Sequence, residues 1–160
     1  MTPFTVIHLQ ENRLDETLPL VRMAAPLLSL ERWQEFARWV TGNGGGILAA
    51  FVGEGRLHGI AAYRTEENLI QGRTLHVEPM VTFELDRSAP ARTALCQALE
   101  LLALARGCNI LTIVTGSRGY ANPNCLKAGA WAPLGFATAS VALSKRVHAM
   151  RSASPVIRAR

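Results

Sequence analysis

The side chains best suited to chemistry lie between Thr74 and Arg106. His76 and Glu78 alternate along the extended segment TLHVEPMVTFEL, so both lie on one face of a strand, where an imidazole and a carboxylate can act as acid and base. A structural role for His76 and a solvent-facing one for Glu78 are the open alternatives. A short loop, DRSAPAR, then leads into a helix. Because a helix N-terminus presents unpaired N–H groups and a positive dipole, this order of strand, loop and helix predicts an anion site suited to phosphate.

These side chains depend on an irregular strand and on a strongly patterned helix. The segment 74–85 is rich in Val, Thr, Leu and Phe, which favours a strand. Pro79 cannot donate to a sheet ladder, so we expect a bulge or a splayed edge at which backbone groups stay free for another partner. Leu95, Leu99 and Leu102 recur at helical spacing before Gly107, which predicts a helix that ends there.

The other expected elements surround this unit. In chain order they are a strand over 4–9, a helix to about 28 interrupted by prolines, a Ser29-capped helix to Gly42, paired strands over 47–52 and 57–63, a polar connection over 65–72, a strand over 110–115, a short helix over 125–131 and a strand over 137–147. The strand over 110–115 follows a helix and should therefore run parallel to the one before it. The glycine-rich run 42–46 precedes a strand, so it predicts a flexible connection rather than a phosphate loop.

Composition indicates one soluble domain in a reducing compartment. The chain has 160 residues and is 49% hydrophobic, which is enough for one sizeable core. No apolar run is long enough to span a membrane and no export signal opens the chain, so no membrane is expected. Its three cysteines form no CxxC pair, which fits the cytoplasm, and its scattered histidines predict no metal site.

The net charge of +5 comes from the C-terminal end. Basic and acidic side chains are equal in number over residues 1–144, and the excess positive charge comes from Lys145, Arg146, Arg151, Arg158 and Arg160. We expect a folded domain over 1–147 and a basic, disordered tail over 148–160. Nucleic-acid binding is not expected, because the basic residues are few and no aromatic residues are interleaved with them. The oligomeric state, a homodimer included, is open.

Two sets of residues at characteristic spacing resemble a known family. The first set is Glu78, then Met80-Val81-Thr82, then the loop Arg87-Ser88-Ala89-Pro90-Ala91-Arg92 and a helix that ends in LARGC. The second is Asn124, six residues, Trp131, three residues and Gly135-Phe136. The chain resembles the GNAT-type N-acetyltransferase superfamily over nearly all of residues 4 to 147. The resemblance implies an α/β fold with a mixed, mostly antiparallel central sheet flanked by helices.

The resemblance also implies a reaction and a site. The co-substrate would be acetyl-CoA or another acyl-CoA, and the acceptor an amine of unknown identity that attacks the thioester directly. Glu78 would be the general base. The residues implied in acyl-CoA binding are Met80, Val81 and Thr82 on the pantetheine arm, Arg87, Ser88, Ala89, Pro90, Ala91 and Arg92 on the pyrophosphate, and Asn124 near the cofactor.

The chain departs from the family pattern at two places. Pro90 and Arg92 replace loop glycines that let backbone N–H groups approach pyrophosphate, so Arg87 and Arg92 could instead clamp the phosphates with their side chains. Trp131 replaces a tyrosine that commonly serves as general acid, and indole cannot release a proton near neutral pH. These departures suggest an alternative function, a non-catalytic acyl-CoA sensor or interaction module with the same fold.

Overall fold

A five-stranded sheet forms the centre of the computed structural model, which describes residues 3–85, 88–114 and 131–137. Its strands, in spatial and chain order, are β1 (Phe4–His8), β2 (Gly46–Val52), β3 (Arg56–Asn68), β4 (Gly72–Thr82) and β5 (Ile110–Ile113). The first four pair antiparallel, and β5 pairs parallel to β4. The expected mixed, mostly antiparallel sheet is therefore confirmed.

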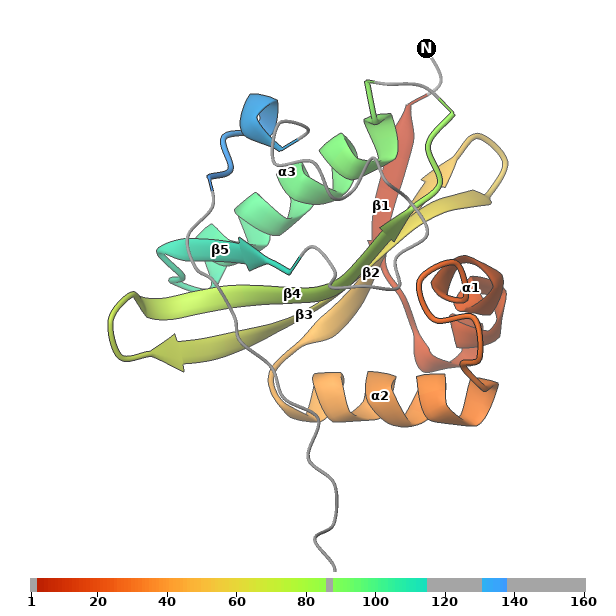
Figure 1. Cartoon of the computed structure of the whole chain (residues 1–160), viewed down its shortest axis with the longest axis horizontal. Coiled ribbons are helices and arrows are strands. Elements are labelled where there is room, and N and C mark those ends of the chain that lie inside the picture. Colours follow the sequence, from red (N-terminus) through yellow and green to blue (C-terminus); the bar gives the residue numbers. More distant parts are fainter. Residues whose placement is uncertain (1–2, 86–87, 115–130, 138–160) are drawn as a thin grey trace, which may run out of the picture.

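Helices cover both faces of this sheet (Figure 1). On one face lie α1 (Leu14–Val21) and α2 (Leu30–Gly42), which share an apolar cluster with one set of strand side chains. On the other face α3 (Pro90–Ala105) packs on the opposite set, through Leu95 and Leu99. Two short 3₁₀ helices, η1 (Glu11–Arg13) and η3 (Ala132–Leu134), complete the described elements.

The helix α2 begins and packs as its sequence predicts. The side chain of Ser29 accepts a hydrogen bond from the Arg32 N–H at 3.1 Å and so caps the first turn. Trp33 and Val40 are buried on its inner face, where the Trp33 indole N–H donates to the Thr17 hydroxyl of α1 at 2.9 Å. This bond ties the two helices together beneath the sheet. The first helix departs from its prediction, because α1 ends at Val21 rather than near 28 and Pro19 lies within it without interrupting it.

The prediction of a polar connection over residues 65–72 is wrong, because β3 continues to Asn68 and pairs with β4 as a long hairpin. Its polar residues are stabilised by cross-strand partners, among them the ion pair of Glu67 with Arg73 at 3.9 Å. The turn itself is short. The Asn68 side-chain oxygen accepts hydrogen bonds from the N–H groups of Ile70 and Gln71, as turn-forming Asn residues commonly do.

The glycine-rich connection before β2 is more closely packed than its composition suggests. A Cβ atom on Gly45 would lie 2.0 Å from the backbone oxygen of Tyr63 and 2.8 Å from a Val40 methyl group. Tyr63 is buried, and its hydroxyl lies 2.8 Å from His8 Nε2, while the Arg106 guanidinium lies 5.1 Å from its ring. Burial raises the pKa of Tyr63 and the Arg106 charge partly offsets this, so the phenol stays protonated.

The Cys96 thiol lies in the apolar cluster between α3 and the sheet and is 1% exposed. Burial, with a smaller contribution from Glu100, raises the pKa of Cys96 from its ordinary value of 9.0 to about 12, and the Arg92 cation lowers it only in part. The folded state therefore holds the thiol proton to a higher pH than the unfolded chain does.

We expect this difference to make stability fall as pH rises from about 9 towards 12. In that window the unfolded chain releases the Cys96 proton and the folded chain keeps it, which costs at most roughly 1.4 kcal/mol per pH unit. Urea unfolding of wild type and Cys96→Ala at pH 8 and pH 10 measures the effect. The variant should lose less stability between the two pH values, and equal losses would contradict the prediction.

The described part of the chain, residues 3–85, 88–114 and 131–137, was searched for membrane spans and for metal-binding groups. No helix there is long and apolar enough to cross a membrane. No group of three or more histidine, cysteine or acidic side chains there could hold a metal ion.

Candidate functional site

The candidate site begins where β4 is kinked. The register of β3 with β4 shifts between Ala61 and Tyr63, so that Glu78 and Pro79 together face a single β3 residue. The bulge expected at Pro79 is confirmed. On the other side of β4, pairing with β5 ends at Val77, because the described part of β5 reaches no further along the strand.

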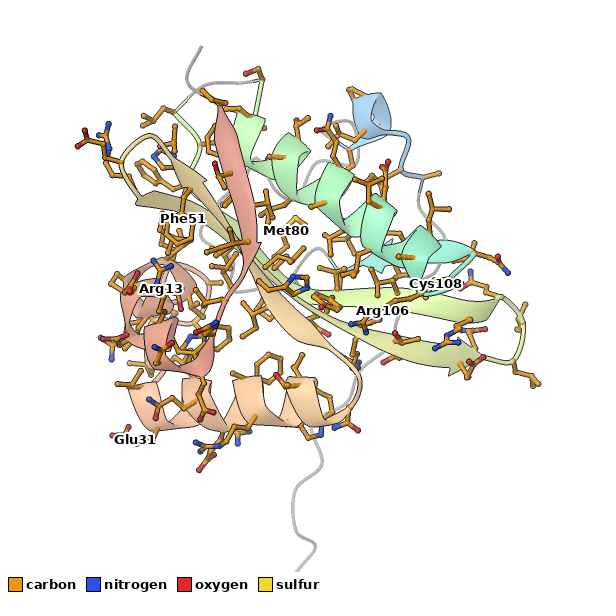
Figure 2. The ribbon with its side chains drawn as sticks, turned by 180° about the vertical axis from the view of Figure 1, so that it is seen from behind. Arg13, Glu31, Phe51, Met80, Arg106 and Cys108 are labelled. Carbon is orange, nitrogen blue, oxygen red and sulfur yellow. The ribbon has the colours of Figure 1, made fainter. Side chains whose placement is uncertain are left out.

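The bulge changes which sheet face receives the side chains that follow. Val77 and Met80 are three positions apart, and in a regular strand they would point to opposite faces. Both instead join the cluster under α3, and Met80 lies between the sheet and that helix (Figure 2). Val81 then packs on the opposite cluster, under α1 and α2.

Beyond the bulge, β4 has one backbone edge with no strand partner among the described residues. The Phe83 N–H donates to the His58 carbonyl at 2.7 Å, so Phe83 faces β3. Backbone groups of successive residues point to alternate edges of a strand, so Val81 also faces β3. The N–H and C=O groups of Met80 and Thr82 consequently face the open edge. Their side chains are buried, which leaves the backbone as the part of these residues that can meet a ligand.

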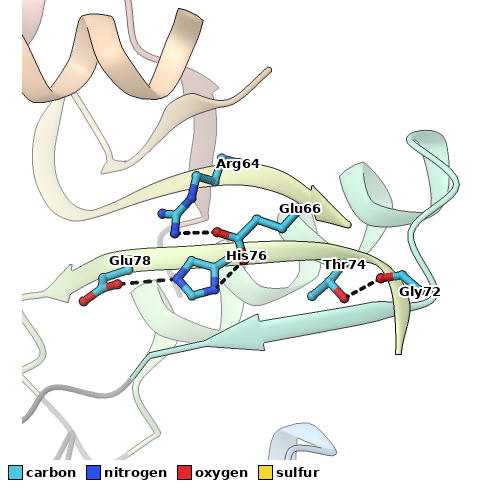
Figure 3. Close-up of polar contacts among 6 residues, drawn as sticks. All are labelled: Arg64, Glu66, Gly72, Thr74, His76 and Glu78. Carbon is cyan, nitrogen blue, oxygen red and sulfur yellow. Dashed lines mark hydrogen bonds and ion pairs between the residues drawn. The ribbon is translucent and has the colours of Figure 1, made fainter. Parts of the chain in front are cut away.

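Glu78 stands at the kink in a row of charged side chains (Figure 3). Its carboxylate lies 3.4 Å from His76 Nε2, and the other ring nitrogen of His76 lies 3.6 Å from Glu66. Arg64 completes the row through an ion pair with Glu66 at 2.5 Å. The Glu78 side chain is 48% exposed and that of His76 is 16% exposed. An accessible carboxylate backed by a largely buried imidazole can accept a proton from a solvent-side group.

Sequence reasoning placed His76 and Glu78 on one face but missed Glu66 and Arg64. Both lie in the second half of β3, whereas the sequence predicts a strand that ends at Tyr63 and a polar connection over 65–72. The signal that could have found them is cross-strand pairing, because Arg64 lies opposite His76 in the register of β3 with β4. This register places the row on the α2 side of the sheet, where the Arg64 guanidinium lies 5.2 Å from the Trp39 ring.

The start of α3 differs from an open phosphate cradle. The residue before the helix, Ala89, has a left-handed backbone with φ 47°. The carboxylate of Glu84 accepts hydrogen bonds from the N–H groups of Arg92 at 2.8 Å and Ala91 at 3.4 Å. Glu84 therefore caps this helix from the preceding loop, a role that sequence reasoning missed because the cap lies outside the usual N-cap position.

The side chain of Arg92 is directed into the protein rather than into solvent. It is 4% exposed, and its guanidinium lies 5.0 Å from the Trp131 ring. Its Nε atom has no hydrogen-bond partner, and within the described ranges no carboxylate forms an ion pair with it. Trp131 is itself buried and meets Phe136 edge to face at 5.5 Å. The tryptophan at the expected tyrosine position is thus a packing residue.

Three expected features lie outside the described residues. They are Arg87 in the loop before α3, Asn124 with the helix predicted around 125–131, and the tail over 148–160. All but the first residue of the strand expected over 137–147 lies outside as well.

Comparison with known proteins identifies the fold. No model of a known protein family matches the chain, and no curated protein does. Among solved structures, the aminoglycoside N-acetyltransferase AAC(6')-Iy in complex with CoA matches with a TM-score of 0.74 and 13% identity, over 91% of this chain and 95% of that one. An acetyltransferase from Trypanosoma brucei matches with a TM-score of 0.69 and 19% identity, over 90% and 99%. Glucosamine-6-phosphate N-acetyltransferase from Arabidopsis thaliana matches with a TM-score of 0.65 and 14% identity, over 89% and 97%.

These identities are low, so the likeness concerns architecture. The chain has the fold of the GNAT-type acetyltransferases, as its sequence resemblance implied.

Proposed function

We propose that the chain is an N-acetyltransferase that moves an acetyl group from acetyl-CoA, or a related acyl group from its thioester, to an amine. The observation that carries this proposal is the open edge of β4 next to the bulge, with Glu78 at the kink. The likeness to an aminoglycoside N-acetyltransferase solved in complex with CoA supports it.

The donor would lie along the open edge of β4. A pantetheine arm carries two amide groups, which can pair with a strand edge as another strand would. In this proposal the backbone groups of Met80 and Thr82 bind that arm, because they face away from β3. Val81 would support this edge indirectly, because its buried side chain packs in the apolar cluster with α1 and α2 and so fixes this part of β4.

Transfer would proceed by direct attack. The neutral amine forms a C–N bond to the thioester carbonyl carbon, the carbonyl oxygen gains negative charge that edge N–H groups stabilise, and the C–S bond breaks to release the thiolate. The amine proton passes to Glu78, directly or through water. His76 would act as a positioning residue, because its ring lies between the Glu78 and Glu66 carboxylates.

A second candidate function is a non-catalytic acyl-CoA sensor or interaction module. The observation that favours it is the burial of Trp131 against Arg92, which leaves no phenol at the position where the family commonly has one. A sensor would bind the donor along the same edge of β4 but would not transfer its acyl group to an amine, so no thiol would be released.

Donor binding and thiol release separate these candidates. We expect acetyl-CoA to bind in a calorimetric titration and free thiol to appear when an amine from a broad panel is added. Binding without thiol release for any amine would favour the sensor. If acetyl-CoA fails to bind at millimolar concentration, both candidates are wrong and only the fold remains.

A further inference from the structure

The N–H groups of Ala91, Arg92 and Thr93, the first that α3 carries within the helix, all have partners within the protein. Pro90 has no N–H. Ala91 and Arg92 donate to the two carboxylate oxygens of Glu84, and Thr93 donates to the Ala89 carbonyl at 3.0 Å. A helix normally offers its first N–H groups to a capping side chain, water or an anion. Here the protein's own carboxylate occupies that place.

The described residues around Glu84 also disfavour a second anion. Ala89 and Ala91 are buried, with exposed fractions of 8% and 0%, so little of the backbone beside Glu84 at the helix start is open to solvent. A phosphate placed against these N–H groups would meet the charge of Glu84. The Arg92 guanidinium could offset this repulsion only from the helix start, but it lies against the Trp131 ring instead.

We propose that Glu84 is a built-in substitute for the pyrophosphate of the acyl donor, so that the chain recognises its donor as a pantetheine thioester along β4. The donor's pyrophosphate would then add nothing to affinity. This inference rests on the proposed function, and it makes Glu84 a residue that determines donor specificity.

The inference is tested by titrating CoA and pantetheine, both reduced, into wild type, Glu84→Ala and Glu84→Gln. Wild type should bind the two compounds with dissociation constants within about threefold of each other. Glu84→Ala should bind CoA about tenfold tighter, because N–H groups become free and a like charge is removed, while pantetheine binding should not change. Glu84→Gln should show a smaller gain in the same direction, since only the charge is lost, and it preserves a capping oxygen if the alanine variant folds poorly.

A matched control is Glu100→Gln, which removes an exposed carboxylate from the same helix away from its start. It should leave both dissociation constants at their wild-type values. An equal gain in CoA affinity for Glu100→Gln would reduce the effect to net charge and overturn the role of Glu84.

Inorganic pyrophosphate gives a readout that does not depend on acyl transfer. The amide NMR resonances of Ala91 and Arg92 should shift on titration of pyrophosphate into Glu84→Ala and stay in place in wild type. Shifts in wild type, or none in the variant, would overturn the inference.

The remaining outcomes distinguish this inference from the function on which it rests. CoA binding that is at least tenfold tighter than pantetheine binding, and unchanged in Glu84→Ala, would overturn the inference alone. If neither compound binds to wild type or to either variant, the proposed function fails and the inference fails with it.

Discussion

Glu78→Gln is expected to lower turnover by about 10² or more while donor affinity stays near that of wild type. General-base catalysis typically contributes this much, and glutamine keeps the shape of glutamate but cannot accept the amine proton. The donor lies along the backbone edge formed by Met80 and Thr82 in our proposal, so the substitution leaves its binding surface intact. Steady-state kinetics with saturating amine, together with a calorimetric titration of acetyl-CoA, measure both quantities.

Glu67→Gln is the matched control for this substitution. Glu67 is on β3 and lies next to Glu66, but its side chain is 77% exposed and pairs only weakly with Arg73, at 3.9 Å. Turnover should stay within about twofold of wild type, because exposed ion pairs contribute little. If Glu78→Gln also retains wild-type turnover, Glu78 is not the base.

Trp33→Ala is expected to destabilise the fold by about 3–5 kcal/mol, a large share of the stability of an ordinary domain. The Trp33 side chain is 1% exposed and fills the space between α1, α2 and the sheet. Its removal leaves a cavity and breaks the indole bond to Thr17. The Thr17 hydroxyl still donates to the Leu14 carbonyl at 2.7 Å, so no buried polar group loses all its partners.

Chemical unfolding in urea, followed by circular dichroism, gives the free energy for this comparison. Trp39→Ala on the same helix is the control, because the Trp39 ring is 49% exposed and contacts Arg64 and Phe36 at the surface. It should cost about 0.5–1 kcal/mol. Equal losses for the two variants would mean that the α1 and α2 layer does not depend on Trp33 as an anchor.

Much of the fold could be predicted because local patterns were strong. Ser29 indicates the N-cap of α2 and Gly42 indicates its end, and α2 begins and ends at these positions. Pro79 indicated the irregularity in β4, which the register confirms. The long β3–β4 hairpin was missed because its polar residues resemble a loop when taken alone, although pairing partners exist for them across the hairpin.

One part of the candidate site could be predicted from the sequence and another part could not. The two-residue spacing of His76 and Glu78 predicted a shared face, and the structure brings the two side chains to 3.4 Å. The missing glycines and the arginines of the loop before α3 suggest a clamp of arginine side chains on phosphate. The structure places the Arg92 side chain beneath Trp131 and assigns the helix cap to Glu84.

Local signals in the sequence predict the central part of each described strand, the helices α2 and α3 and the bulge at Pro79, together with the resemblance to the GNAT-type superfamily. Such signals are local because hydrogen-bond periodicity sets which side chains share a face. Three contacts join residues from separate segments and appear only in the folded chain: Glu66 with His76, Glu84 with the start of α3, and Arg92 with Trp131. These contacts depend on strand register and on the path of loops. The Glu84 carboxylate, for example, lies eight residues before Arg92 and reaches the Arg92 N–H group only because the intervening backbone turns back.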